Sequence, residues 1–150
     1  MESDSWEGPV GVFEETLGLT DASARVQWRR IALRRPASRQ EAYLPVELVI
    51  CMSLFRILRP NSYGGANIHT VPIEVKVLAQ TFQRTPGSIV SKMLNLKGAR
   101  ENGAAREPEL FQALSVPGQL EPYLRLVVAA ARTEGFQSDR VPEIVQGRSA

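Results

Sequence analysis

The chain has 150 residues, of which 43% are hydrophobic, and this is enough for one folded domain with its own core. No apolar run approaches the roughly 20 residues that cross a bilayer, and the N-terminal sequence is acidic where a signal peptide is basic, so we expect a cytoplasmic protein with no membrane partner. The single cysteine, Cys51, excludes an internal disulfide and a cysteine-based zinc site.

The net charge of +2 hides an uneven distribution. Residues 1–24 contain six acidic residues and no Lys or Arg, whereas residues 25–150 contain eighteen basic and ten acidic residues, which leaves +8. Such a split is typical of an acidic segment attached to a domain that binds a polyanion. A well-solvated surface has the same composition, so charge alone does not decide the function.

The N-terminal residues 1–19 are acidic and rich in glycine, and we expect a flexible arm. Thr20 or Asp21 then caps a helix that runs to about Arg35. The residues at helical spacing that we expect to be buried are Ala24, Trp28, Ile31 and Ala32. The rest of this segment is a dense positive patch, made of Arg25, Arg29, Arg30, Arg34, Arg35 and Arg39.

Pro45 is well placed to begin a second helix, which ends before Pro60. Its residues 48–58 are apolar on nearly every side, which predicts a helix buried in the middle of the domain. The next segment, to about residue 71, is full of turn-forming residues and predicts a loop.

The strongest periodicity lies between residues 72 and 98. Apolar residues at i, i+3, i+4 and i+7 predict a helix over 72–82, and Thr85 with Pro86 predicts the start of another helix that ends at Gly98. The side chains that the second helix should bury are Ile89, Val90, Met93, Leu94 and Leu96. Two helices joined by so short a turn cross steeply, as in a helix-turn-helix.

Residues 99–106 predict a polar loop, Pro108 begins a short helix, and Pro122 begins a last helix that Gly135 ends. We see no convincing strand pattern. The expected fold is therefore all-α, a compact bundle of about five helices that contains a helix-turn-helix. The domain should cover residues 20–136, with a disordered tail over 137–150.

A helix that reads DNA needs polar side chains near its N-terminus and positive charge around it. The second helix of the pair has both on the face opposite its apolar residues, since Asn can pair with adenine, and Arg or Lys with guanine. The residues that we expect to contact DNA here are Arg84, Thr85, Ser88, Ser91, Lys92, Asn95 and Lys97. Further phosphate contacts are expected from Arg29, Arg30, Arg34, Arg35 and Arg100. Any surface helix carries some of these residue types, so the pattern favours DNA binding without proving it.

The run LAQTFQRTPGSIVSKMLNL, preceded by the apolar helix ELVICMSLFRIL, resembles the helical N-terminal region found ahead of the nuclease domain in bacterial HNH endonuclease-like proteins, including restriction enzymes. The likeness covers about residues 45–115, and its most specific part is Arg84, Thr85, Pro86, Lys92, Met93 and Asn95. It implies a module that recognises double-stranded DNA. The family's nuclease half needs paired histidines around a metal ion, and this chain has one histidine, His69.

The sequence therefore predicts a non-catalytic DNA-binding protein or recognition domain, with no metal and no cofactor, linked to restriction or to transcription regulation. A homodimer or a nuclease partner stays open. The alternative from another class is a protein interaction or dimerisation module, which would use the apolar stripe of the last helix, Leu124, Val127, Val128 and Ala131. An enzyme is the weakest hypothesis, because it would rest on His69 and Glu74 alone.

Overall fold

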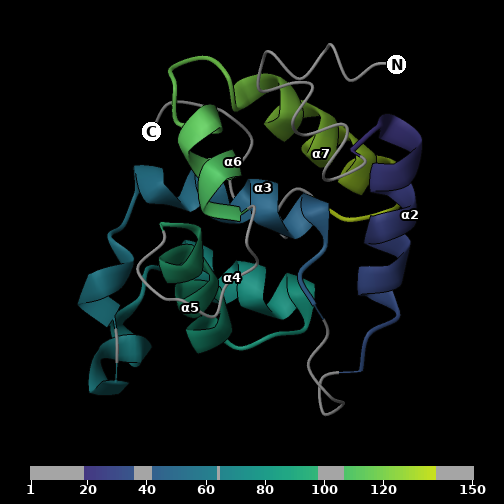
Figure 1. Ribbon diagram of the computed structural model, residues 1–150. Helices are drawn as coiled ribbons and strands as arrows, with labels where there is room; N and C mark the ends of the chain where they lie inside the picture. The colour runs from purple at the N-terminus through teal and green to yellow at the C-terminus, as the bar shows by residue number, and fades with distance from the viewer. Residues whose placement is uncertain (1–18, 36–41, 64, 98–106, 138–150) are drawn as a thin grey trace.

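The computed structural model describes residues 19–35, 42–63, 65–97 and 107–137, and every regular element within them is helical, which confirms the all-α prediction (Figure 1). The described part contains six α-helices where about five were predicted. They are α2 (Asp21–Ala32), α3 (Pro45–Ser53), α4 (Ile73–Phe82), α5 (Pro86–Leu96), α6 (Glu107–Leu114) and α7 (Glu121–Thr133). Between α3 and α4, the described residues form three 3₁₀ helices, η2 (Leu54–Arg56), η3 (Pro60–Tyr63) and η4 (Gly65–Thr70).

Helix α3 is the centre of the bundle, as its composition predicts. Every residue of α3 after Pro45 is buried. In Figure 1, α6 and α7 lie above α3, α4 and α5 lie below it, and α2 runs along one side. The helix is shorter than predicted, because its last turn before Pro60 tightens into η2, and the segment predicted as a loop forms η3 and η4. None of the described helices is both long and apolar enough to span a membrane.

Helix α2 starts as predicted but ends early, at Ala32, and its packing differs in two residues. Thr20 forms the N-cap, with a reciprocal hydrogen-bond pair to Ser23. Ala32, predicted to be buried, is exposed, whereas Gln27 is buried because its side-chain oxygen accepts a hydrogen bond from the Val46 N–H at 3.0 Å. A glutamine thus satisfies a free N–H at the start of α3, and this is a role that apolar periodicity does not reveal.

The boundary between the predicted arm and the domain also moves. Leu19, assigned to the flexible arm, is only 2% exposed and belongs to the core. It directly precedes the N-cap, the position from which an apolar side chain packs back against the first turn of a helix. The remaining arm residues and residues 138–150 lie outside the described part of the chain.

Two contacts fix α2 against α7 and the residues that follow it. The Trp28 indole N–H donates to the Val127 carbonyl at 3.0 Å, and the Trp28 ring lies 4.7 Å from the ring of Phe136. The predicted stripe of α7 faces this interface and the centre of the bundle, and all four of its residues, Leu124, Val127, Val128 and Ala131, are buried. The stripe therefore belongs to the core.

Candidate nucleic-acid interface

The predicted helix pair is present, with α4 and α5 joined by a turn of three residues. The turn depends on Gln83, whose φ of 60° is left-handed. Its shape lets the Arg84 N–H donate to the Ala79 carbonyl at 2.8 Å and the Gln83 N–H to the Gln80 carbonyl at 3.1 Å, so the end of α4 is capped. Thr85 then caps α5, as predicted, by accepting a hydrogen bond from the Ser88 N–H at 3.1 Å.

The polar residues of α5 gather on one face. At 3.6 residues per turn, Ser88, Ser91, Lys92 and Asn95 fall within an arc of about 100°. They lie opposite Val90 and Met93, which are buried in the core. The structure thus brings together four of the predicted contact residues, although all four side chains are only partly exposed.

Helix α5 is partly covered by neighbouring elements. Each of its residues from Pro86 to Leu96 is buried or only partly exposed, because α3, α4, α6 and η3 all pack against it. The two flanking residues, Thr85 and Lys97, are exposed. A recognition helix that enters a major groove projects from the surface, and α5 does not project in this way.

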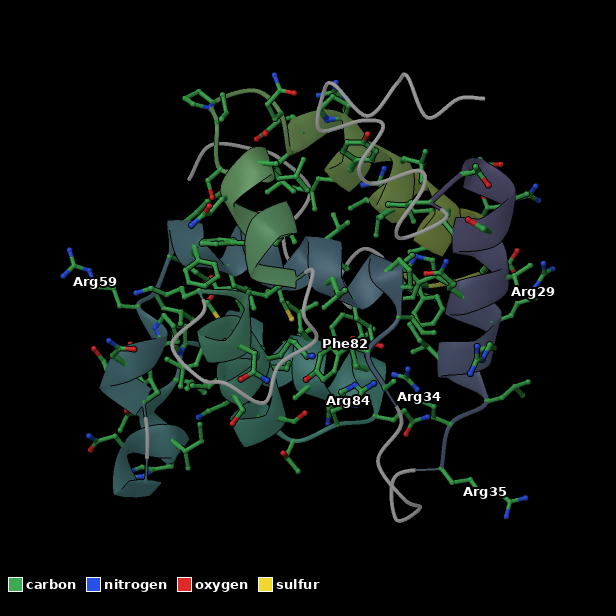
Figure 2. The ribbon with its side chains drawn as sticks, viewed as in Figure 1. Arg29, Arg34, Arg35, Arg59, Phe82 and Arg84 are labelled. Atoms are coloured by element: carbon green, nitrogen blue, oxygen red, sulfur yellow. The ribbon has the colours of Figure 1, made fainter. Side chains whose placement is uncertain are left out.

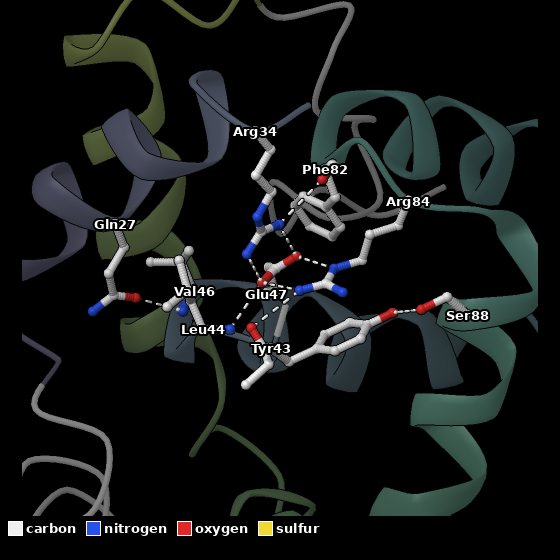
Figure 3. Close-up of polar contacts among 10 residues, drawn as sticks. Gln27, Arg34, Tyr43, Leu44, Val46, Glu47, Phe82, Arg84 and Ser88 are labelled. Carbon is white, nitrogen blue, oxygen red and sulfur yellow. Dashed lines mark hydrogen bonds and ion pairs between the residues drawn. The ribbon is translucent and has the colours of Figure 1, made fainter. Parts of the chain in front are cut away.

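Arg84, the predicted contact residue just before α5, lies inside the protein. Its side chain is only 2% exposed, and its Nε donates to Glu47 Oε2 at 2.7 Å. Its Nη2 donates to Glu47 Oε1 at 3.2 Å and to the Ala42 carbonyl at 3.1 Å (Figure 3). The prediction of a DNA contact at Arg84 therefore needs correction, because its hydrogen-bonding groups face the interior.

The prediction of a phosphate contact at Arg34 also needs correction, because this side chain is buried as well. Its side chain is 5% exposed, and its two terminal nitrogens donate to the two oxygens of Glu47 at 2.7 and 2.9 Å. Arg34 Nη1 also donates a hydrogen bond of 3.1 Å to the Phe82 carbonyl at the end of α4. We call Arg34, Glu47 and Arg84 the Glu47 cluster. It joins the end of α2, the start of α3 and the turn of the helix pair (Figure 3).

The electrostatics of the Glu47 cluster favour an ionised carboxylate. Burial alone raises the pKa of the Glu47 carboxyl, but hydrogen bonds from Arg34, Arg84 and the Leu44 N–H outweigh this and hold that pKa below its ordinary value. Glu47 was missed in the sequence. A signal was present, since Glu47 is the one charged residue in an otherwise apolar run, and a charge at such a position must be paired.

Tyr43, also missed in the sequence, connects the Glu47 cluster to the face of α5. The Arg84 guanidinium lies 3.8 Å from the centre of the Tyr43 ring, and the Lys92 ammonium lies 5.0 Å from it. The Tyr43 hydroxyl shares a hydrogen bond of 2.7 Å with Ser88 Oγ. Burial raises the pKa of Tyr43 well above its ordinary value, so the hydroxyl stays neutral. The contacts with Tyr43 thus help to hold the side chains of Ser88 and Lys92 in place.

Asn95 is poorly placed to read a base. Its side-chain oxygen is shielded from solvent and has no hydrogen-bond partner among the described residues. Rotating the amide by 180° would put the nitrogen in the same shielded place, so one end of the amide is covered in either orientation. Pairing with adenine uses both ends.

The exposed arginines of α2 lie apart from the face of α5. Arg29, Arg30 and Arg35 are exposed, as predicted, and Figure 2 shows Arg29 and Arg35 pointing outward on the side of the molecule that α2 covers. Arg29 lies 3.6 Å from Glu134. Helix α5 lies across the bundle from α2 (Figure 1), so the structure does not unite the two predicted contact sets. Arg100 lies outside the described residues.

Within the described part of the chain, no three His, Cys, Asp or Glu side chains are grouped as a metal site would need. His69 is exposed in η4. Comparison of the chain with protein families, with curated proteins and with solved structures gave no match.

Proposed function

We propose that this chain is a non-catalytic DNA-binding protein or a recognition domain. The observation that carries the proposal is the polar face of α5, held on a capped helix-turn-helix and bordered by Lys97. The excess of basic residues after residue 24 supports it, because positive charge supplies affinity for phosphates. Because α5 is partly covered by its neighbours, we expect the duplex to lie along this helix, with contacts mainly to the backbone.

The contact set is narrower than the sequence predicts. We assign the primary contacts to Thr85, Ser88, Ser91, Lys92 and Lys97, whose side chains reach the surface at least in part. The Glu47 cluster keeps a structural role beneath them.

The exposed arginines of α2 form a separate, second set in this proposal. Arg29, Arg30 and Arg35 add general positive charge that attracts DNA, and they do not share a surface with α5. Because two distant surfaces cannot both make the primary contact with one short duplex, we expect these arginines to change the association rate more than the specificity.

A salt titration tests the interface. Binding of the full chain to a random duplex is measured by fluorescence anisotropy between about 50 and 200 mM salt, where the log-log slope falls by about 0.9 for each lost phosphate contact. We expect Lys92→Ala and Lys97→Ala each to reduce the slope by about this amount. Lys76→Ala is the matched control, since Lys76 is an exposed lysine of α4 outside the contact set.

The possible outcomes distinguish a failure of the α5 interface from a failure of the DNA-binding proposal as a whole. Equal effects of Lys76→Ala and Lys92→Ala would show that binding depends on net charge and would remove α5 from the interface. Absence of binding even at low salt would overturn the DNA proposal itself. The protein interaction alternative has lost the surface proposed for it, because the stripe on α7 is buried.

A further inference from the structure

A cleft of about 340 Å³ lies between the end of α3 with η2 and the segment that runs from α6 to the start of α7. It takes no part in the proposed DNA interface. Three buried side chains, Met52, Leu114 and Leu120, form its apolar lining. Its volume falls near the lower end of the range of about 300–1,000 Å³ that is typical of small-molecule sites.

Two aromatic rings give the cleft its chemical character. Phe55 of η2 and Phe111 of α6 lie with their ring centres 4.6 Å apart and their planes tilted by 42°. Both are only partly buried, so part of each ring faces the open space. Flat aromatic ligands pack well against such rings.

The polar groups at the rim carry no net charge. Arg56 and Glu121 form an ion pair there, with side chains that are 29% and 35% exposed. The Ser115 hydroxyl is already engaged with the Phe111 carbonyl at 2.7 Å. The rim therefore offers donors on Arg56 and acceptors on Glu121. A neutral group that can both donate and accept a hydrogen bond fits it best, and a full charge of either sign would have to break the pair.

We propose that this cleft binds a small, uncharged aromatic molecule that carries one hydroxyl or N–H group, as phenols and indoles do. A free small molecule suits the site better than a protein partner. Val116 is the one large hydrophobic residue at this rim that is highly exposed within the described chain, and a stable protein interface needs about 1,000 Å² or more with an apolar centre.

The test uses the full ¹⁵N-labelled chain and three probes, phenol, indole and toluene, followed by two-dimensional NMR. We expect phenol and indole to cause saturable shifts of amide signals from residues 52–56 and 111–121. Their dissociation constants should lie at about 0.1–10 mM, as for other ligands of this size. Toluene has the ring without the polar group and should bind more weakly.

Two tryptophan substitutions at similarly exposed valines provide the matched pair. Val116→Trp places a large side chain at the mouth of the cleft and should weaken phenol binding by about tenfold, whereas Val26→Trp on α2 should leave it unchanged. Val116 is 53% exposed and Val26 is 49% exposed, so both variants should fold. Val116→Phe is a smaller replacement that repeats the test if the tryptophan variant is poorly folded.

Arg56→Gln tests the rim and should weaken phenol binding but not toluene binding. Three results would overturn the proposal. They are no saturable shift at the cleft residues with phenol or indole, equal losses in the two tryptophan variants, and equal binding of phenol and toluene that Arg56→Gln leaves unchanged.

Discussion

Glu47 is the residue on which the polar interior of this protein depends. Its carboxylate lies between two buried guanidinium groups that together carry one more positive charge than it neutralises. The excess positive charge is stabilised by neutral groups that contact the two guanidinium groups. These are the carbonyls of Phe82 and Ala42 and the ring of Tyr43. A buried charge is tolerated only when it is paired and hydrogen-bonded, and here all three charged groups meet that condition.

Glu47→Gln should therefore destabilise the protein strongly. The substitution keeps the size of the side chain but leaves two buried arginines without their counter-charge, and such losses cost about 3–5 kcal/mol. Urea denaturation at neutral pH, followed by circular dichroism, measures the change. Asp21→Asn is the control, because it removes an exposed pair with Arg25 of 3.2 Å and should cost about 1 kcal/mol or less. Equal costs in the two variants would contradict the structural role of Glu47.

The lowered pKa of Glu47 also predicts how stability depends on pH. Because the folded protein holds the carboxyl ionised, this contribution is complete above the unfolded pKa of about 4.3 and is lost as the pH falls through the lower folded pKa. The free energy of unfolding of the natural chain should therefore fall on acidification below about pH 4 more steeply than that of Glu47→Gln. Urea titrations at several pH values between 7 and 3 would show it, and parallel curves would rule it out.

At the scale of elements, Gln83 bears a backbone cost for the tight turn between α4 and α5. Residues other than glycine lose about 1 kcal/mol or more in the left-handed region. The turn still forms, because the Arg84 N–H caps α4 and the Arg84 side chain reaches Glu47. The turn of the helix pair thus depends on one residue with a left-handed backbone, next to one buried ion pair.

Gln83→Gly should stabilise the protein by about 0.5–1 kcal/mol, since glycine adopts a φ of 60° without strain. Gln80→Gly, three residues earlier on the exposed face of α4, should have the opposite sign and cost about 1 kcal/mol, because it places glycine inside a helix. Thermal unfolding of the two variants provides the comparison. A loss of stability in both would mean that the side chain of Gln83 matters more than its backbone.

The starts of the helices were predictable from the sequence, because capping residues and prolines act locally. Thr20, Pro45 and Thr85 stand where the structure uses them. The burial of Arg34 and Arg84 was not predictable in this way. Both follow the last turn of a helix, and their direction depends on Glu47, which lies 13 and 37 positions away in the chain.

The candidate site was also predictable only in part, where its features depend on local sequence. Helical spacing identified the polar face of α5, but it could not show that four neighbouring elements pack against this helix or that the polar side chains are only partly exposed. The apolar stripe of α7 was ambiguous for a related reason, since a stripe fits a partner and a core equally well until the neighbours are placed. Sequence periodicity gives the direction of a side chain relative to its own helix, and the exposure depends on the rest of the bundle.

At the scale of the whole molecule, the acidic N-terminal segment balances much of the basic charge. Residues 1–18 contain five acidic residues and no basic ones, so their removal changes the net charge from +2 to +7. A chain of higher positive charge attracts polyanions more strongly over long range.

Deletion of residues 1–18 should therefore raise the affinity for a random duplex at low salt, with the gain shrinking as salt is added. Fluorescence anisotropy at two salt concentrations measures it. A second variant that keeps these residues but replaces their five acids by the corresponding amides should behave like the deletion. An unchanged affinity in both variants would show that the segment does not influence binding.

The position of Arg34 has a consequence for how the protein can be divided. A fragment that begins at α3 would contain the whole helix pair, Glu47 and Arg84, but it would lack Arg34 together with the Trp28 ring that packs beside Phe82. We therefore expect the helix pair to lose stability when it is grafted elsewhere or expressed without α2. By the same reasoning, we expect a fragment that begins at Leu19 and extends past α7 to Phe136 to keep these contacts.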